Sequence, residues 1–226
     1  MYATGETHKN LALFDFDGTL CKKDSFTGFI FFALSKRHIV KQGLKLLPWI
    51  QAYYLNIYPA HAMRPKLFYG MFKDTDYAEI QQIAEEYAHQ LMHDLDPKFI
   101  EQLRQHQALG HDVVLVSASV DLYLKPLCQL LSIDLICTKT EIRDGRLTGY
   151  YQSADCSRME KKNRISQQYS VAEYASIYAY GNSEEDLEMF SLAQYTYMVG
   201  RDQKLPALPA HLKNGLNFNI SFNFQA

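Results

Sequence analysis

The amino-acid sequence predicts an α/β fold: a doubly wound parallel sheet with an all-helical cap inserted after the first strand. Short apolar runs alternate with amphipathic stretches from residue 94 onward, the order typical of a parallel sheet with helices on both faces. Residues 21–93, between the first apolar run and this alternation, show helical patterns and few strand signals. Several apolar runs end in polar clusters, at the edge where open parallel sheets bind ligands.

Each predicted strand is an apolar or alternating run bounded by polar or turn-forming residues. The predicted strands cover residues 11–17, 112–117, 135–138, 176–180, 195–199 and 215–224. Residues 141–151 predict a hairpin, because Asp144 followed by Gly145 is a strong short-turn signal.

The predicted helices follow from apolar spacing and from capping residues. Residues 80–92 keep the i, i+3, i+4, i+7 spacing of an amphipathic helix, and Asp96 followed by Pro97 marks the start of the next helix. Three later helices are expected: one that ends at residue 131, one over residues 161–169 and one over 185–193. The resulting domains are a core, residues 1–20 plus 94–226, and a helical cap, residues 21–93.

The formal net charge of −2 hides a strong segregation of charge. Residues 25–73 contain no Asp or Glu and seven basic residues, which leaves 16 basic against 25 acidic residues elsewhere. The seven are Lys36, Arg37, Lys41, Lys45, Arg64, Lys66 and Lys73. This basic segment fits three interpretations: a solvated helical face, electrostatic attraction of anionic substrates, or contact with an anionic membrane surface. Aromatic residues interleaved with the lysines, such as Trp49 and Tyr54, suit the membrane interpretation, whereas no nucleic-acid-binding motif accompanies the charge.

The chain predicts a cytoplasmic protein, with contact to a membrane surface as the alternative. Its first residues lack the layout of a signal peptide, and the four widely spaced cysteines are typical of reduced thiols. The longest uncharged run, residues 46–63, is interrupted by Pro, Asn, Gln and His and falls short of the roughly 20 apolar residues of a membrane span.

Polar clusters at four strand or helix ends predict phosphoryl-transfer chemistry. They contain paired carboxylates, a hydroxyl and an ammonium, which suit that reaction because its catalysis rests on positioning and charge stabilisation. The clusters are Asp15-x-Asp17-Gly18-Thr19, Ser117-Ala118-Ser119, the lysine-rich segment near Lys161, and Gly181-Asn182-Ser183 with Asp186. Asp15 and Asp17, two positions apart at a strand end, point to the same side and can act together.

These motifs resemble a known superfamily. The run from Asp15 to Leu20, DFDGTL, is similar to the first motif of the haloacid dehalogenase-like (HAD) hydrolases, and GNSEED, ending at Asp186, is similar to their fourth. The insertion after the first motif, the Ser-Ala-Ser run and DGRLTG, ending at Gly149, resemble the phosphoserine phosphatase-like branch, subfamily IB. The resemblance covers roughly residues 11–200 and implies a HAD-like, Rossmannoid core.

The resemblance implies specific roles. Asp15 would be the nucleophile, Asp17 the general acid and base, and Lys161 the cation of the third motif, with Lys162 or Arg158 as alternatives. Substrate or phosphate contacts would come from Ser117, Ala118, Gly18, Thr19 and Asp24. A Mg²⁺ cofactor would be held by Asp15, the backbone carbonyl of Asp17, Asn182 and Asp186.

The sequence departs from the family pattern at two places. Asn182 stands where an aspartate is usual, which removes one negative charge from the metal site. Asp24 replaces the glutamate that phosphoserine phosphatases carry nine positions after the nucleophile, and it suits a helix N-cap equally well. Around Phe68 and Tyr69, where a substrate-binding cap arginine is expected, the sequence has aromatic residues, which disfavours phosphoserine as the substrate.

We therefore expect a Mg²⁺-dependent phosphatase that hydrolyses a small anionic phosphomonoester through an aspartyl-phosphate. One alternative is a membrane-associated lipid phosphate phosphatase, similar to relatives that act on phosphatidylglycerophosphate. A second, of another class, is a catalytically weakened module that binds phosphate or a partner. Transfer of the phosphoryl group to an acceptor other than water is also open.

Overall fold

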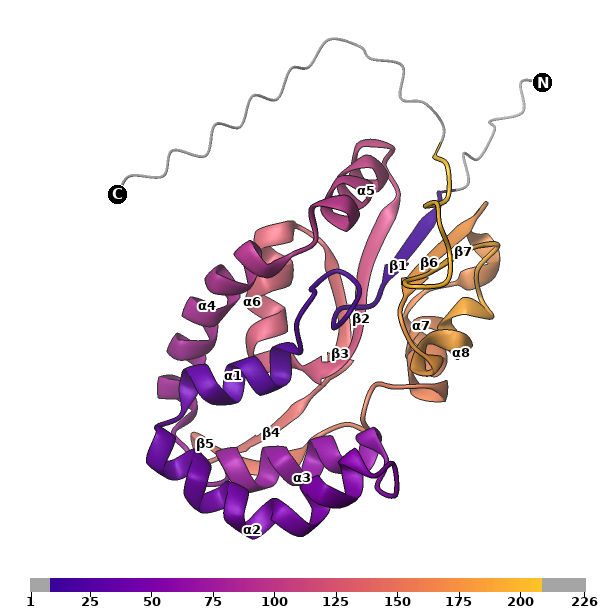
Figure 1. The fold of residues 1–226 in the computed structure, drawn as a ribbon. Coiled ribbons are helices and arrows are strands. Elements are labelled where there is room, and N and C mark those ends of the chain that lie inside the picture. The colour runs from indigo at the N-terminus through magenta and orange to yellow at the C-terminus, as the bar shows by residue number, and fades with distance from the viewer. Residues whose placement is uncertain (1–8, 209–226) are drawn as a thin grey trace, which may run out of the picture.

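The computed structural model describes residues 9–208. Their central feature is a five-stranded sheet in the order β3-β2-β1-β6-β7 (Figure 1). All of its strands run parallel, which confirms the predicted fold class. Its strands are β1 (Leu11–Phe14), β2 (Asp112–Val120), β3 (Asp134–Thr138), β6 (Ile177–Gly181) and β7 (Tyr195–Met198). The strand predicted at residues 215–224 lies outside the described residues.

Helices cover both faces of this sheet. They are α5 (Pro97–Ala108) and α6 (Asp121–Leu131) on one face, and α7 (Met159–Gln168) and α8 (Leu187–Phe190) on the other (Figure 1). Strand β1 is central and wholly buried, which explains its unbroken apolar sequence. Its Phe14 packs in the cluster that includes Leu103 of α5, and its Leu13 packs in the cluster that includes Ile165 of α7.

The helix predicted over residues 185–193 is shorter in the structure. A 3₁₀ turn, η2 (Glu184–Asp186), precedes the four-residue α8. The side chain of Asp186 folds back over this turn and accepts hydrogen bonds from the backbone N–H groups of Asn182 and Ser183, at 3.0 and 3.1 Å. A second 3₁₀ turn, η1 (Val171–Glu173), follows α7.

The cap consists of four helices at one end of the sheet. They are α1 (Ser25–Ala33), α2 (Lys36–Tyr54), α3 (Ala60–Phe72) and α4 (Tyr77–Asp94). The chain segments that lead into and out of the cap lie side by side, because Lys22 N–H donates to the Asp94 carbonyl and Asp96 N–H donates to that of Leu20.

The predicted hairpin forms from β4 (Thr140–Arg143) and β5 (Arg146–Tyr151), but it packs against the cap. The backbone of Leu147 exchanges hydrogen bonds with Asp74 and Thr75, which follow α3, at 2.9 and 3.0 Å. Figure 1 shows this hairpin beside α3, where it continues from the end of β3. Residues 94–226 therefore include a segment that belongs spatially with the cap, which its position in the sequence does not reveal.

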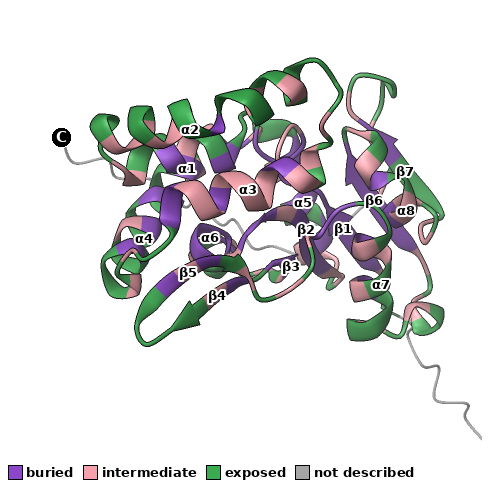
Figure 2. Ribbon diagram, turned by 90° about the horizontal axis from the view of Figure 1, so that it is seen from below, coloured by how far each residue is buried: buried purple, intermediate pink, exposed green. Residues whose placement is uncertain are grey.

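Burial differs sharply between the inner strands of the sheet and α2. Figure 2 shows β1, β2 and β6 mostly buried, while α2, in which only Leu46 is buried, is mostly exposed. All four cysteines are buried and free, in agreement with the expectation of reduced thiols. In the described part of the chain, none of the helices is both long and apolar enough to cross a membrane.

Candidate active site

The predicted polar clusters meet at the carboxyl ends of β1, β2 and β6, beneath the cap. There a cavity of about 500 Å³ is lined by residues that follow the strands and by residues of the cap helices. Asp15, Asp17, Ser117, Lys161 and Asp186 all line its inner end. Residues far apart in the sequence are thus brought together as the motif spacing predicts.

Asp15 lies at the centre of this cluster and is buried. Its Oδ1 accepts a hydrogen bond from Lys161 Nζ at 2.6 Å, and its Oδ2 accepts one from Thr19 Oγ1 at 3.0 Å. Burial raises the pKa of Asp15 to about 7, against the lowering effect of Lys161, and the nearby carboxylates of Asp186 and Asp17 add to the rise. The cluster is therefore short of positive charge.

Lys161 is the cation that touches both carboxylates. Its Nζ also donates to Asp186 Oδ1 at 2.6 Å, and its side chain is only 2% exposed. Although burial disfavours the ammonium, the two carboxylates raise the pKa of Lys161 above its usual value, so it stays charged. Of the alternatives, Lys162 donates to Ser191 Oγ and Arg158 is exposed. The geometry therefore supports Lys161 as the third-motif cation.

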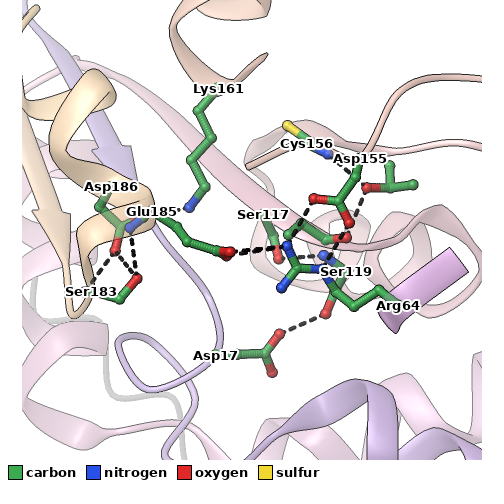
Figure 3. A network of polar contacts seen from close by, with 12 residues as sticks. Asp17, Arg64, Ser117, Ser119, Asp155, Cys156, Lys161, Ser183, Glu185 and Asp186 are labelled. Carbon is green, nitrogen blue, oxygen red and sulfur yellow. Dashed lines mark hydrogen bonds and ion pairs between the residues drawn. The ribbon is translucent and has the colours of Figure 1, made fainter. Parts of the chain in front are cut away.

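Asp17 is held at both carboxylate oxygens. Its Oδ1 accepts from the backbone N–H of Ser25 in α1 at 2.6 Å. Its Oδ2 accepts from Ser119 Oγ in β2, also at 2.6 Å (Figure 3). Burial raises the pKa of Asp17, while these hydrogen bonds oppose the rise. The contacts made by Ser119 and Ser25 were not predicted. The second serine of the Ser-Ala-Ser run was the one signal for Ser119.

The predicted phosphate contacts divide into two groups. Ser117 and Ala118 line the cavity, and Ser117 Oγ accepts from the backbone N–H of Ser119, so its own proton stays available to a ligand. By contrast, Gly18 N–H donates to the Cys21 carbonyl at 2.7 Å, and the Thr19 hydroxyl donates to Asp15. These two donors are used inside the loop, so they shape it and do not face an incoming anion.

Gly18 also explains how the first and fourth motifs pack together. Its φ of +78° lies in the left-handed region, and a Cβ at this position would lie 2.0 Å from Asn182 Nδ2. The side chain of Asn182 therefore rests directly on the glycine that follows Asp17.

The residues suggested for Mg²⁺ fit the ion by charge and chemistry. Among these residues the carboxylates of Asp15, Asp17 and Asp186 outnumber the ammonium of Lys161. Burial is the main cause of the raised pKa of Asp15, and the neighbouring carboxylates of Asp186 and Asp17 add to the rise. Within residues 9–208, no three His, Cys, Asp or Glu side chains are grouped as metal ligands. Mg²⁺ does not require such a group, because it takes one or two carboxylates and keeps several waters.

Asp24 lies at the start of α1 and caps that helix. Its Oδ1 accepts from Thr27 N–H at 2.9 Å and its Oδ2 from Thr27 Oγ1 at 3.0 Å. Asp24 is exposed but also lines the cavity. The structure thus assigns a capping role to Asp24 and leaves it near the space a substrate would occupy.

Arg64 of α3 is a cap cation that sequence reasoning counted as part of the basic surface. Its Nε and Nη2 donate to Asp155 at 2.7 and 2.8 Å, and Nη2 also contacts Glu185 at 3.2 Å (Figure 3). Arg64 lines the cavity one helical turn before Phe68, which is fully buried. Arg64 lies 91 and 121 positions from Asp155 and Glu185 in the sequence, so no local pattern identified its contacts.

The outer part of the cavity is apolar. Its lining comes from the first three cap helices and includes Phe26, Ile30, Phe31, Ile39, Ile50, Tyr53, Tyr54, Met63, Leu67 and Met71. The cavity therefore joins a charged inner end to an apolar outer region.

Comparisons with known proteins agree with this architecture. The family model of haloacid dehalogenase-like hydrolases matches residues 12–191. Protein CicA of Caulobacter vibrioides is 31% identical over 191 residues, which cover 81% of this chain and 82% of CicA. Histidinol-phosphatase of Neisseria meningitidis is 24% identical over 212 residues, 87% of this chain and 93% of that protein. A substrate-bound phosphoserine phosphatase has a similar fold, with a TM-score of 0.62 at 18% identity over 84% of this chain and 86% of the other.

The chain belongs to the haloacid dehalogenase-like hydrolase family. Its fold is that of the phosphoserine phosphatase-like members, as predicted. The family is one of hydrolases.

Proposed function

We propose that the protein hydrolyses a phosphomonoester in two steps through an aspartyl-phosphate on Asp15, with Mg²⁺ as cofactor. The observation that carries this proposal is the buried contact of Asp15 with Lys161, next to a second aspartate, Asp17, held at both oxygens. A nucleophile, a fixed cation and a separate acid and base are the groups that such a reaction requires.

In the first step, a carboxylate oxygen of Asp15 attacks phosphorus and the bond from phosphorus to the leaving oxygen breaks. Asp17 gives its proton to that oxygen, so the alcohol leaves neutral. In the second step, Asp17 takes a proton from water as the water oxygen attacks phosphorus, which releases inorganic phosphate and restores Asp15. Lys161 and the Ser117 hydroxyl bind phosphoryl oxygens in both steps.

The metal would be held by Asp15, the Asp17 carbonyl, Asn182 and Asp186. When bound, Mg²⁺ supplies positive charge that offsets the negative charge of the phosphoryl group. Asn182 contributes a neutral oxygen where a carboxylate is usual, so we expect weaker metal affinity than an Asn182→Asp variant would show.

The decisive test is phosphate release from an aryl phosphate with and without Mg²⁺. Asp15→Asn should abolish turnover and leave the circular dichroism spectrum unchanged, because the amide is nearly the size of the carboxyl. Full activity in Asp15→Asn would exclude the mechanism. Mg²⁺-dependent turnover by the unchanged protein would exclude the alternative of a non-catalytic binding module.

A second candidate, a lipid phosphate or another amphiphilic phosphomonoester, is supported by the apolar outer region of the cavity. An apolar chain gains free energy there in proportion to the area it buries, about 0.8 kcal/mol per CH₂ group. A series of n-alkyl phosphates should therefore show KM falling as the chain lengthens. The same assay should include phosphoserine and histidinol phosphate. Preference for either over long alkyl phosphates would contradict the amphiphilic class.

Contact of the cap with an anionic membrane surface is supported by the outer face of α2. Val40 and Leu44 are 61 and 67% exposed, and the lysines at 41 and 45 beside them are exposed as well. An exposed apolar stripe flanked by lysines is typical of helices that lie on membranes.

This contact is tested by sedimentation with vesicles rich in anionic lipid at low salt. Leu44→Glu should weaken binding, because it places a charge in the apolar stripe and repels the lipid surface. Leu130→Glu is the matched control, since Leu130 is an exposed leucine on α6 of the core. If the unchanged protein does not sediment with the vesicles, membrane contact through the cap is excluded.

A further inference from the structure

A buried set of hydroxyl groups lies directly behind Asp17. Ser25 Oγ is 3.0 Å from Tyr123 Oη and 3.4 Å from Ser119 Oγ. Tyr87 of α4 donates to the Ser25 carbonyl at 2.9 Å. Ser25, Tyr123 and Ser119 are 0, 0 and 4% exposed.

Such a group is expensive to bury unless every hydroxyl finds a partner. Here the hydrogen bonds converge on one carboxyl, that of Asp17. The donors come from two domains, since Ser119 belongs to β2 of the core and Ser25 to α1 of the cap. The arrangement ties the orientation of the proposed acid and base to the docking of the cap.

We propose that Ser119 is a positioning residue: its hydroxyl holds the carboxyl of Asp17 in the orientation needed to hand a proton to the leaving oxygen. The inference rests on the proposed two-step mechanism and adds a residue to it. Tyr123 supports the arrangement by holding Ser25, whose N–H binds the other oxygen of Asp17.

The physical need for such a residue lies in the terminal torsion of aspartate. Rotation of the carboxyl about χ2 is soft and has no narrow preferred angle. A proton donor must nevertheless come within hydrogen-bond reach of the leaving oxygen. Hydrogen bonds at both Asp17 oxygens fix this rotation, and each oxygen keeps a further lone pair for the transferred proton. Ser119 keeps its own proton throughout the reaction.

Two other roles for Ser119 make different predictions. If Ser119 bound the phosphoryl group, its removal would weaken the reaction of every phosphomonoester alike. If its role were structural only, its removal would lower stability and affect all substrates by a common factor. A positioning role affects most the substrates whose leaving oxygen needs the proton.

The experiment compares kcat/KM of p-nitrophenyl phosphate, whose leaving group is stable as an anion, with that of n-hexyl phosphate, whose leaving group is not. This parameter reports events up to the first irreversible step, here the attack of Asp15. In Ser119→Ala the ratio of alkyl to aryl kcat/KM should fall about 10- to 100-fold, the range expected for losing one hydrogen bond to a charged group. Ser119→Thr, which keeps a hydroxyl, should restore most of the ratio.

Tyr123→Phe is the control, because it removes a hydroxyl of the same buried group and leaves the contact of Ser119 with Asp17 in place. Its ratio should fall less than that of Ser119→Ala. Should Ser119→Ala fail to fold, Ser119→Cys gives the same comparison, since a thiol is a similar-sized but weaker donor. An unchanged ratio in the variant that folds overturns the proposal.

Failure of this inference is distinguishable from failure of the proposed function. If the unchanged protein hydrolyses neither substrate, the proposed mechanism is refuted, and with it the role of Ser119. If it hydrolyses both, and the Ser119 variants lose activity equally on both, the mechanism stands and the positioning role is wrong.

Discussion

Replacing Lys161 by methionine is the perturbation whose outcome the structure constrains most. Lys161 Nζ lies 2.6 Å from a carboxylate oxygen of Asp15 and 2.6 Å from one of Asp186, and all three residues are buried. Lys161→Met keeps most of the side-chain volume and removes the one ammonium that contacts both carboxylates. The buried carboxylates of Asp15 and Asp186 then lie close together with no ammonium between them.

The magnitude follows from these distances. At an effective dielectric constant of 20, two charges 2.6 Å apart attract by about 6 kcal/mol, and the burial of the ions offsets much of that attraction. Removing one partner of a buried ion pair costs about 3–5 kcal/mol, and we expect a loss in this range at pH 8.

The loss should depend on pH, because the acids can take up protons. Without Lys161, the pKa of Asp15 rises further above its value of about 7, whereas the unfolded chain has a value near 3.8. The folded variant therefore binds a proton that the unfolded chain lacks, so its stability falls as pH rises through this window. Because the further rise in this pKa is specific to the variant, the loss relative to the unchanged protein should be smaller at pH 5 than at pH 8.

Urea unfolding at both pH values, with EDTA present, measures these differences. The double variant Lys161→Met with Asp15→Asn is the control, since it also removes the carboxylate of Asp15. Its free energy of unfolding should fall less than that of Lys161→Met alone. A loss below about 1 kcal/mol at pH 8, or the same loss at both pH values, would refute this reasoning.

Three further predictions concern other parts of the molecule. Burial lowers the pKa of His106 to about 3, so acid favours the unfolded chain, whose histidine titrates near 6.5. The contribution of His106 to the free energy of unfolding should therefore fall by about 1.4 kcal/mol for each pH unit between 6.5 and about 3, so in urea titrations over that range His106→Gln should lose less stability than the unchanged protein. Arg64→Met should lower the free energy of unfolding by about 1.5–3 kcal/mol, and a double-mutant cycle with Asp155→Asn should give a coupling energy above about 1 kcal/mol. The control Arg37→Met, on the exposed face of α2, should change the free energy of unfolding by less than about 0.5 kcal/mol. Asp24→Ala should lose about 1 kcal/mol through the lost cap of α1, and Asp24→Asn much less; equal losses would contradict the capping role.

The sequence predicts most accurately where local chemistry decides the structure. The buried strand before Asp15 and the strand before Asn182 are unbroken apolar runs, which parallel central strands require. Asp96 followed by Pro97 starts α5 as expected, because capping depends on adjacent residues alone. The polar clusters after the strands meet because parallel strands share one carboxyl edge.

The features that the sequence did not reveal depend on contacts between distant segments. Arg64 is one of seven basic residues in an acid-free stretch, and only the docking of α3 brings it to Asp155 and Glu185. The hydroxyl of Ser119 gains its role from Asp17, 102 positions earlier in the chain. The turn of the hairpin was predicted correctly from Asp144 and Gly145. Its packing on α3 depends on contacts between segments that are distant in the sequence.

The cap joins the core through more than its own two ends. Those ends lie hydrogen-bonded side by side near Cys21 and Leu95, so the insertion leaves the path from β1 to α5 almost uninterrupted. Yet α3 rests on the hairpin of residues 140–151, which belongs to the other half of the chain. An exchange of the cap, in evolution or by design, would therefore have to include two segments, the inserted helices and the hairpin. A chimaera that carries a foreign cap alone would lack the matching contact between α3 and the hairpin.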